Sequence, residues 1–174
     1  MLKALKTILF IFVISLLGAC ASGVTRMDGV ALDSMPKVDK TVKSVSVNLS
    51  NDAKKLLADN MQFNQDTLRS TIERSLNAQN SLKVESSQSL DIEITSFRVR
   101  SAFAAVMFGI MAGHDNVEGV VSIKGVDGKV LKQAKVSATY ALGGVMGGNE
   151  VRMSWLYEEF AKHTVSELSG MSVK

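Results

Sequence analysis

The chain has 174 residues, of which 46% are hydrophobic and 21% charged, and both fractions are ordinary for a single globular domain. Lys3 and Lys6 are the only charged residues among the first 19, which leaves 18 of the 20 basic residues against all 17 acidic residues in the remainder. This near balance gives no strong positive field, so we expect no nucleic-acid partner.

The first 19 residues are predicted to be a secretory signal peptide. Lys3 and Lys6 form a basic start, an apolar run extends from Ile8 to Leu17, and small residues precede Cys20. The apolar run is about half of the ~20 residues that a membrane-spanning helix needs. The segment is therefore typical of a cleaved signal rather than a membrane span.

Leu17, Gly18, Ala19 and Cys20 resemble the lipobox of bacterial lipoproteins, in which a leucine and two small residues precede a cysteine. The resemblance implies transfer of diacylglycerol to the Cys20 thiol, cleavage after Ala19 and acylation of the new amino group. Cys20 is the only cysteine, so it has no intrachain disulfide partner. Ala21 implies, by the rule known for enteric lipoproteins, sorting to the outer membrane with the domain facing the periplasm. The alternative is an ordinary secretory signal with an incidental cysteine.

Residues 20–41 are predicted to form the lipidated N-terminus and a tether, and residues 42–174 a single α+β domain. The tether segment contains scattered polar residues, two glycines and Pro36, the only proline of the chain. It shows no sustained strand or helix period, which is typical of an extended linker that holds a domain off a membrane.

A strand and a long helix are predicted at the start of the domain. Apolar and polar residues alternate over 42–49, which indicates a half-buried strand. Residues 50–52 supply an N-cap candidate for a helix over about 51–78. The apolar stripe of this helix is Ala53, Leu57, Met61, Leu68, Ile72 and Leu76. We expect the helix to pack on a sheet, with a coiled-coil partner surface as the alternative.

Alternating residues predict several further strands. Residues 82–86 form a short candidate, and a longer run that begins at Leu90 shifts its apolar phase by one between Thr95 and Phe97. A β-bulge near this shift would keep one face of the strand buried. Asp127-Gly128 separates two alternating runs, so 116–125 and 129–141 are predicted to form a hairpin.

Two uncharged segments are the candidate contact regions. Residues 102–113 (AFAAVMFGIMAG) are too short to span a bilayer. Three interpretations compete: a buried helix or loop under the sheet, an exposed apolar lip that contacts a membrane or a partner, and a pocket wall. Residues 142–149 (LGGVMGGN) lack a P-loop pattern, and a turn capped by Asn149 is favoured over an anion site. The candidate contact residues are Phe103, Val106, Met107, Phe108, Ile110, Met111, Val145 and Met146.

The chain is predicted to close with a helix from about Glu150 to Leu168, which Gly170 stops. Trp155 and Tyr157 are interpreted as packing residues. The predicted buried stripe is Leu156, Phe160, Ala161, Thr164 and Leu168.

The residue types and spacings show no arrangement typical of catalysis. His114 and His163 are the only histidines, and neither has the His, Cys or carboxylate spacing of a metal site. His114 and Asp115 are interpreted as a surface pair, and His163 as a favourable contact with a helix C-terminus. We therefore expect no metal, no cofactor and no enzymatic activity.

The order of these elements predicts an α+β fold. We expect a mostly antiparallel sheet of four to five strands, with a long helix after the first strand and a C-terminal helix packed on one face. With the lipobox, the segments ITSFRVRSAF, GIMAGHDNVEGVVSI and VDGKVL resemble a group of Gram-negative lipoproteins without an assigned activity. The element order is similar to the TolB N-terminal-like fold and to auxiliary lipoproteins of envelope transport systems. The resemblance implies the fold and the location.

Two functional hypotheses follow from this sequence. The first is a non-enzymatic outer-membrane lipoprotein, held to the membrane through Cys20, that acts as an adaptor or accessory subunit of an envelope assembly. The alternative is a carrier of lipid or of another hydrophobic ligand, with a pocket lined by residues 102–113.

Overall fold

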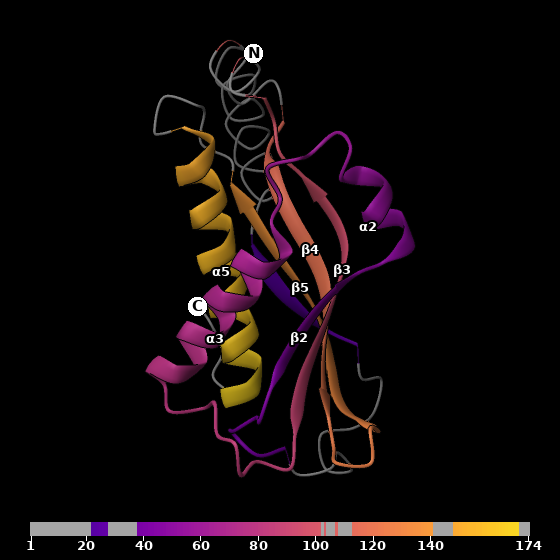
Figure 1. The fold of residues 1–174 in the computed structure, drawn as a ribbon, viewed down its shortest axis with the longest axis vertical. Helices are drawn as coiled ribbons and strands as arrows, with labels where there is room; N and C mark the ends of the chain where they lie inside the picture. Colours follow the sequence, from indigo (N-terminus) through magenta and orange to yellow (C-terminus); the bar gives the residue numbers. More distant parts are fainter. Residues whose placement is uncertain are drawn as a thin grey trace, which may run out of the picture.

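The computed structural model describes residues 22–27, 38–101, 103, 107, 113–140 and 148–170. The predicted α+β class is confirmed, with the C-terminal helix packed on the sheet (Figure 1). The elements are β1 (Gly23–Arg26), β2 (Val45–Leu49), α2 (Asn51–Leu56), α3 (Gln65–Ala78), β3 (Ser89–Arg98), β4 (Asp115–Lys124), β5 (Val130–Tyr140) and α5 (Asn149–Ser169).

The strands form one mixed sheet in the order β1-β5-β4-β3-β2. β1 pairs with β5, β5 with β4 and β4 with β3 in antiparallel fashion, whereas β2 pairs parallel to β3. The parallel pair needs a crossover connection, and α2 and α3 provide it. The expectation of a mostly antiparallel sheet is therefore confirmed.

The predicted bulge and hairpin are also present. β3 changes register against β4 between Ile94 and Ser96. β4 and β5 are joined by a turn in which the Gly125 nitrogen donates to the Lys129 oxygen at 2.9 Å, and Gly128 has a φ of 78°. A positive φ suits glycine, so the Asp127-Gly128 pair explains both the position and the tightness of the turn.

The hydrophobic core lies between the sheet and the two longer helices, α3 and α5, which pack against one another (Figure 1). Gly119 of β4 permits close approach of α5. A Cβ atom there would lie 3.0 Å from the Glu93 carbonyl oxygen and 3.2 Å from Phe160 Cζ. The predicted buried stripe of α5 is confirmed, because Leu156, Phe160, Ala161, Thr164 and Leu168 are all buried.

The prediction of one long helix over 51–78 is wrong. α2 begins at its N-cap Ser50 and ends at Leu56. α3 begins after a second N-cap, Asn64, whose Oδ1 accepts from the Thr67 nitrogen at 2.9 Å. A capping side chain satisfies a backbone N–H group at a helix start, so Asn64 marks a new helix rather than the middle of one.

The connection between α2 and α3 also changes which side chains are buried. Met61, predicted to be on the buried stripe, is 88% exposed, and Leu57 is exposed as well. Phe63 is buried in their place, and its ring stacks on that of Phe97 with centroids 4.2 Å apart. The remaining stripe residues, Ala53, Leu68, Ile72 and Leu76, are buried as predicted.

Three further expectations need correction. Residues 82–86 do not form a strand; Leu82 makes only an isolated bridge to Val42. Asn149 does not cap α5, because Gly148 is the N-cap and Asn149 Oδ1 instead accepts from Arg152. Gly23–Arg26 lies within the predicted tether but pairs with β5 as an edge strand.

Candidate functional site

Two connections leave the sheet at the same end. β3 ends at Arg98 and β4 begins at Asp115, while β5 ends at Tyr140 and α5 follows Gly148. Antiparallel pairing of β3 with β4 and of β4 with β5 brings these strand ends together. We call this the loop end, and the end with the turn at 125–129 the hairpin end; in Figure 1 they lie at opposite ends of the long axis.

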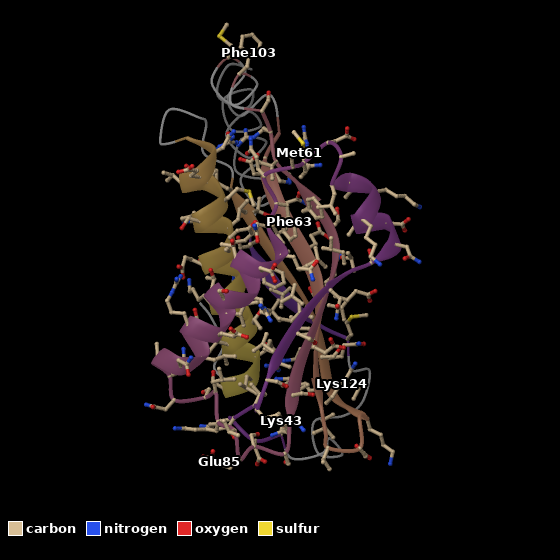
Figure 2. All side chains as sticks on the ribbon, in the orientation of Figure 1. Lys43, Met61, Phe63, Glu85, Phe103 and Lys124 are labelled. Atoms are coloured by element: carbon tan, nitrogen blue, oxygen red, sulfur yellow. The ribbon has the colours of Figure 1, made fainter. Side chains whose placement is uncertain are left out.

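Phe103 and Met107 are exposed at the loop end. Both have helical backbone, and 67% of Phe103 and 62% of Met107 is accessible to water. Figure 2 shows Phe103 beyond the end of the sheet. At these two positions the exposed interpretation fits the structure, and the buried interpretation does not.

The other predicted contact and lipidation residues lie outside the described residues. They are Val106, Phe108, Ile110 and Met111 of the first segment, Val145 and Met146 of the second, and Leu17, Gly18, Ala19 and Cys20 of the lipobox.

A second exposed apolar pair lies on the first turns of α5. Val151 is 55% and Trp155 41% exposed, and these residues are also four apart. The Trp155 ring meets the Tyr140 ring edge to face, with centroids 5.3 Å apart, so the pair lies beside the loop end. The packing interpretation is confirmed for Tyr157, which is 3% exposed. It is only partly correct for Trp155, which packs on Tyr140 but is 41% exposed. We call Val151 and Trp155 the α5 pair.

The base of the loop end is a buried cluster of two arginines and one aspartate. Arg152, Arg100 and Asp115 are at most 4% exposed. Asp115 Oδ1 accepts from the Arg100 nitrogen at 2.7 Å and from its Nε at 3.2 Å. Asp115 Oδ2 accepts from Arg100 Nη2 at 3.1 Å and from Arg152 Nη1 at 2.6 Å. One carboxylate therefore serves two guanidinium groups.

The remaining donors of this cluster bind backbone at the bases of both connections. Arg100 Nη1 donates to the Gly113 oxygen at 2.6 Å and Arg100 Nη2 to the Tyr140 oxygen at 3.4 Å. Arg152 Nη2 donates to the Arg100 oxygen at 2.9 Å. Since these groups flank residues 102–112 and 141–147, the cluster fixes the points where both connections begin and end.

The electrostatics of the cluster favour a charged Asp115. Burial by itself raises the pKa of the Asp115 carboxyl group. The hydrogen bonds from Arg100 and the charges of Arg152 and Arg100 lower this pKa by more than burial raises it. The net result is a pKa below the ordinary 3.8. The expectation of a surface pair between His114 and Asp115 is wrong, because Asp115 is 0% exposed and binds the arginines.

Sequence reasoning missed this cluster, although the periodicity contains a signal for it. Asp115 is in phase with the buried positions Val117 and Val121 of β4. Arg152 is in phase with Leu156 and Phe160 on the buried face of α5. A charged residue in phase with a buried face needs a partner of opposite charge, and here Arg152 and Asp115 form an ion pair with each other.

A cavity of about 420 Å³ lies between α3 and α5. Tyr157 forms part of its wall, and its hydroxyl accepts from the Asn64 nitrogen at 2.7 Å. Burial raises the pKa of Tyr157 to about 12, so the hydroxyl stays protonated. The residues that line it are Gln62, Asn64, Thr67, Thr71, Arg74, Asn149, Glu150, Met153, Ser154 and Tyr157.

A second cavity, of about 500 Å³, lies between β1 and α5 and contains His163. Burial lowers the pKa of His163, although nearby Glu159 raises it in part. The lowered pKa disfavours the charged ring on which the predicted contact with the helix C-terminus depends. Ser166 Oγ donates to the His163 carbonyl oxygen at 2.7 Å rather than to the ring.

A third, shallower hollow of about 520 Å³ is lined by the α5 pair with Glu150, Ser154 and Glu158. None of these three cavities is lined by Phe103 or Met107.

Within the described ranges, no three His, Cys, Asp or Glu side chains come together as metal ligands. No helix in the described part of the chain has the length and apolar character to cross a membrane.

The fold and the site define an α+β domain that exposes apolar side chains around one end of a five-stranded sheet. Residues 27–144 match the model of the DUF4410 family, a domain of unknown function, and the chain belongs to this family. The matched range contains β2 to β5 with Arg100 and Asp115, whereas β1 and α5 lie outside it.

No curated protein matches the chain. Among solved structures, the chain is similar to a PelC dodecamer variant from Paraburkholderia phytofirmans, with 15% identity, 83% of this chain and 97% of that chain covered, and a TM-score of 0.48. A second PelC dodecamer from the same organism has 13% identity, the same coverage and a TM-score of 0.42. A minor lipoprotein from Acinetobacter baumannii has 11% identity, 74% and 93% coverage, and a TM-score of 0.41.

Proposed function

We propose that the protein is a lipid-anchored accessory protein of the Gram-negative cell envelope, which binds a protein partner and catalyses no reaction. The lipobox ending at Cys20 supports the anchor, and Ala21 supports sorting to the outer membrane, with the domain in the periplasm. Stable anchoring takes more than one acyl chain, which a triacylated cysteine provides.

The observation that carries the proposal is the exposure of two apolar pairs around the loop end. Phe103 and Met107 form one pair, and Val151 and Trp155 the other. Contiguous apolar side chains in contact with water mark interaction surfaces, and tryptophan is enriched among the residues that dominate binding energy. The buried cluster of Arg100, Asp115 and Arg152 holds the backbone next to both pairs in place, so less conformational freedom is lost on binding.

The cavities support binding rather than catalysis. In the cavity that contains His163, the neighbouring Ser166 hydroxyl is directed to a backbone oxygen, which is not the arrangement of a nucleophile and its base. The alternative hypothesis of a lipid carrier requires an apolar cavity lined by residues 102–113. The three cavities described above are lined by other residues.

A photo-crosslinking residue at Val151 tests the partner. Val126, in the turn at the hairpin end, is the matched control because it is a valine of 79% exposure. In cells, we expect discrete protein adducts from position 151 and none from position 126. If the protein with the crosslinker at position 151 is acylated at Cys20 and still gives only the monomer band, this result would contradict a protein partner on α5. Loss of palmitate labelling in a Cys20→Ala variant checks the anchor.

A further inference from the structure

We propose that the loop end lies directly against the lipid bilayer, with Phe103 and Met107 inserted at the lipid interface, and that β1 fixes this orientation. The inference rests on the proposed lipidation of Cys20. It assigns the two exposed apolar pairs to different contacts: Phe103 and Met107 to lipid, and the α5 pair to the protein partner.

The first argument is the short distance between the anchor and the sheet. The Thr139 nitrogen donates to Ser22 Oγ at 2.8 Å, and Gly23 pairs with Ser137 in β5. Only two peptide units separate Ser22 from Cys20. They span at most about 7 Å. A free tether over all of residues 20–41 would instead allow a separation of about 70 Å.

The second argument is the position of Ser22 in the sheet. Thr139, its hydrogen-bond partner, pairs with Asn116 of β4, and the next pair is Tyr140 with Asp115. Ser22 is therefore level with the beginning of β4, at the loop end. An acylated Cys20 must have its acyl chains in the bilayer, so the loop end is the part of the described domain that lies nearest to the membrane.

The third argument is the chemistry of the surface at this end. Phe103 and Met107 belong to a run, residues 102–113, whose sequence contains no Asp, Glu, Lys or Arg, so no charge of those types adjoins them in the chain. Phe103 and Met107 expose most of their surface, and Phe103 extends past the sheet (Figure 2). Exposed apolar side chains that bind a membrane surface enter the headgroup and acyl boundary by roughly 5–10 Å.

The same short distance argues against a protein at the tip of the loop end. A single helix with its side chains is about 10–12 Å thick, which is more than the two peptide units span. A protein layer therefore does not fit between the bilayer and the strand that carries the anchor. Val151 and Trp155 lie on the first turns of α5, beside the loop end, and we assign them to the partner.

Tryptophan fluorescence in vesicles tests the orientation. Trp155 is the only tryptophan, so a Trp155→Phe background removes the native signal. Into this background we would introduce Phe103→Trp or, as the control at the hairpin end, Val126→Trp. The acylated full-length protein is then reconstituted in phosphatidylethanolamine and phosphatidylglycerol vesicles with brominated acyl chains. We expect the Phe103→Trp emission to shift to shorter wavelength and to lose most of its intensity, and the Val126→Trp emission to stay unchanged.

The outcomes separate this inference from the proposed function. Unquenched Phe103→Trp, or equal quenching at both positions, in protein whose Cys20 is acylated by mass spectrometry would overturn the inference and leave the proposed function intact. An unmodified Cys20 in membrane-extracted protein would remove the basis of both. Met107→Trp repeats the measurement at the second exposed position, so a folding defect in one variant does not decide the result.

Discussion

Asp115 is the residue on which the rigidity of the loop end depends. Its carboxylate accepts from both Arg100 and Arg152, and all three side chains are buried. Asp115→Asn would leave two guanidinium groups without a counter-charge at this site. Removing one partner of a buried ion pair costs about 3–5 kcal/mol. We expect a loss of that size in the free energy of unfolding, measured with urea.

Asp59→Asn is the matched control, because Asp59 is exposed. A surface substitution of this kind changes stability by about 0.5 kcal/mol or less.

The pH dependence gives an independent readout for Asp115. Its folded pKa lies below the unfolded value, so its contribution is complete above the unfolded pKa and is lost as the pH falls through the folded pKa. Asp115→Asn should therefore lose less stability on acidification below about pH 5 than the wild type does. Identical acid profiles would contradict the role given to this carboxylate.

Single residues could be predicted from the sequence where a local period determines their burial. The alternating buried positions of β3 and the stripe of α5 follow from such periods. The link from Arg152 to Asp115 could not be predicted, because it joins residues 37 positions apart and depends on how α5 packs on β4. His163 was missed for the same reason: its burial depends on β1 and α5 together.

Among the elements, those with a local chemical signal were predicted and those without it were missed. Asp127-Gly128 determined the hairpin, and a phase shift revealed the bulge. The break between α2 and α3 was missed because apolar spacing continues through Leu57 and Met61, both of which face water. The cap at Asn64 was the available signal. β1 has only four residues, too few to show a period.

The start of α5 offers a direct test of backbone conformation. Gly148, its N-cap, has a φ of −66° and makes no side-chain cap hydrogen bond. A Cβ atom would have no heavy atom within 4 Å at either Gly148 or Gly128, but Gly128 has a φ of 78°. Gly148→Ser should therefore stabilise the protein by about 0.5–1 kcal/mol, through a new cap and a less flexible unfolded chain.

Gly128→Ser should destabilise the protein by about 1–2 kcal/mol, because the left-handed conformation disfavours a Cβ atom. Urea unfolding of the two variants compares the same substitution in two backbone conformations. If both changes have the same sign, φ does not determine the outcome at these positions.

At the scale of the whole molecule, β1 connects the anchor to the sheet. β3, β4 and β5, which flank the two uncharged segments, pair within one sheet, and β1 adds residues 23–26 to the edge of this sheet. The side chains support this attachment, since Arg26 Nε donates to Glu167 Oε2 of α5 at 3.3 Å. We therefore expect the orientation at the membrane to depend on the chain length before β1 and not on the chain length after it.

Insertions on the two sides of β1 test this property. About ten Gly and Ser residues inserted between Ala21 and Ser22 add a coil with an r.m.s. length of about 17 Å. The effective concentration of the loop end at the bilayer should fall on the order of tenfold, so quenching of Phe103→Trp by brominated lipid should approach the Val126→Trp value. The same insertion between Ser34 and Met35 adds equal length after β1, and it should leave the quenching unchanged. Because the first insertion spares β1, it should also leave the free energy of unfolding unchanged. An equal loss of quenching for both insertions would show that β1 does not hold the loop end at the membrane.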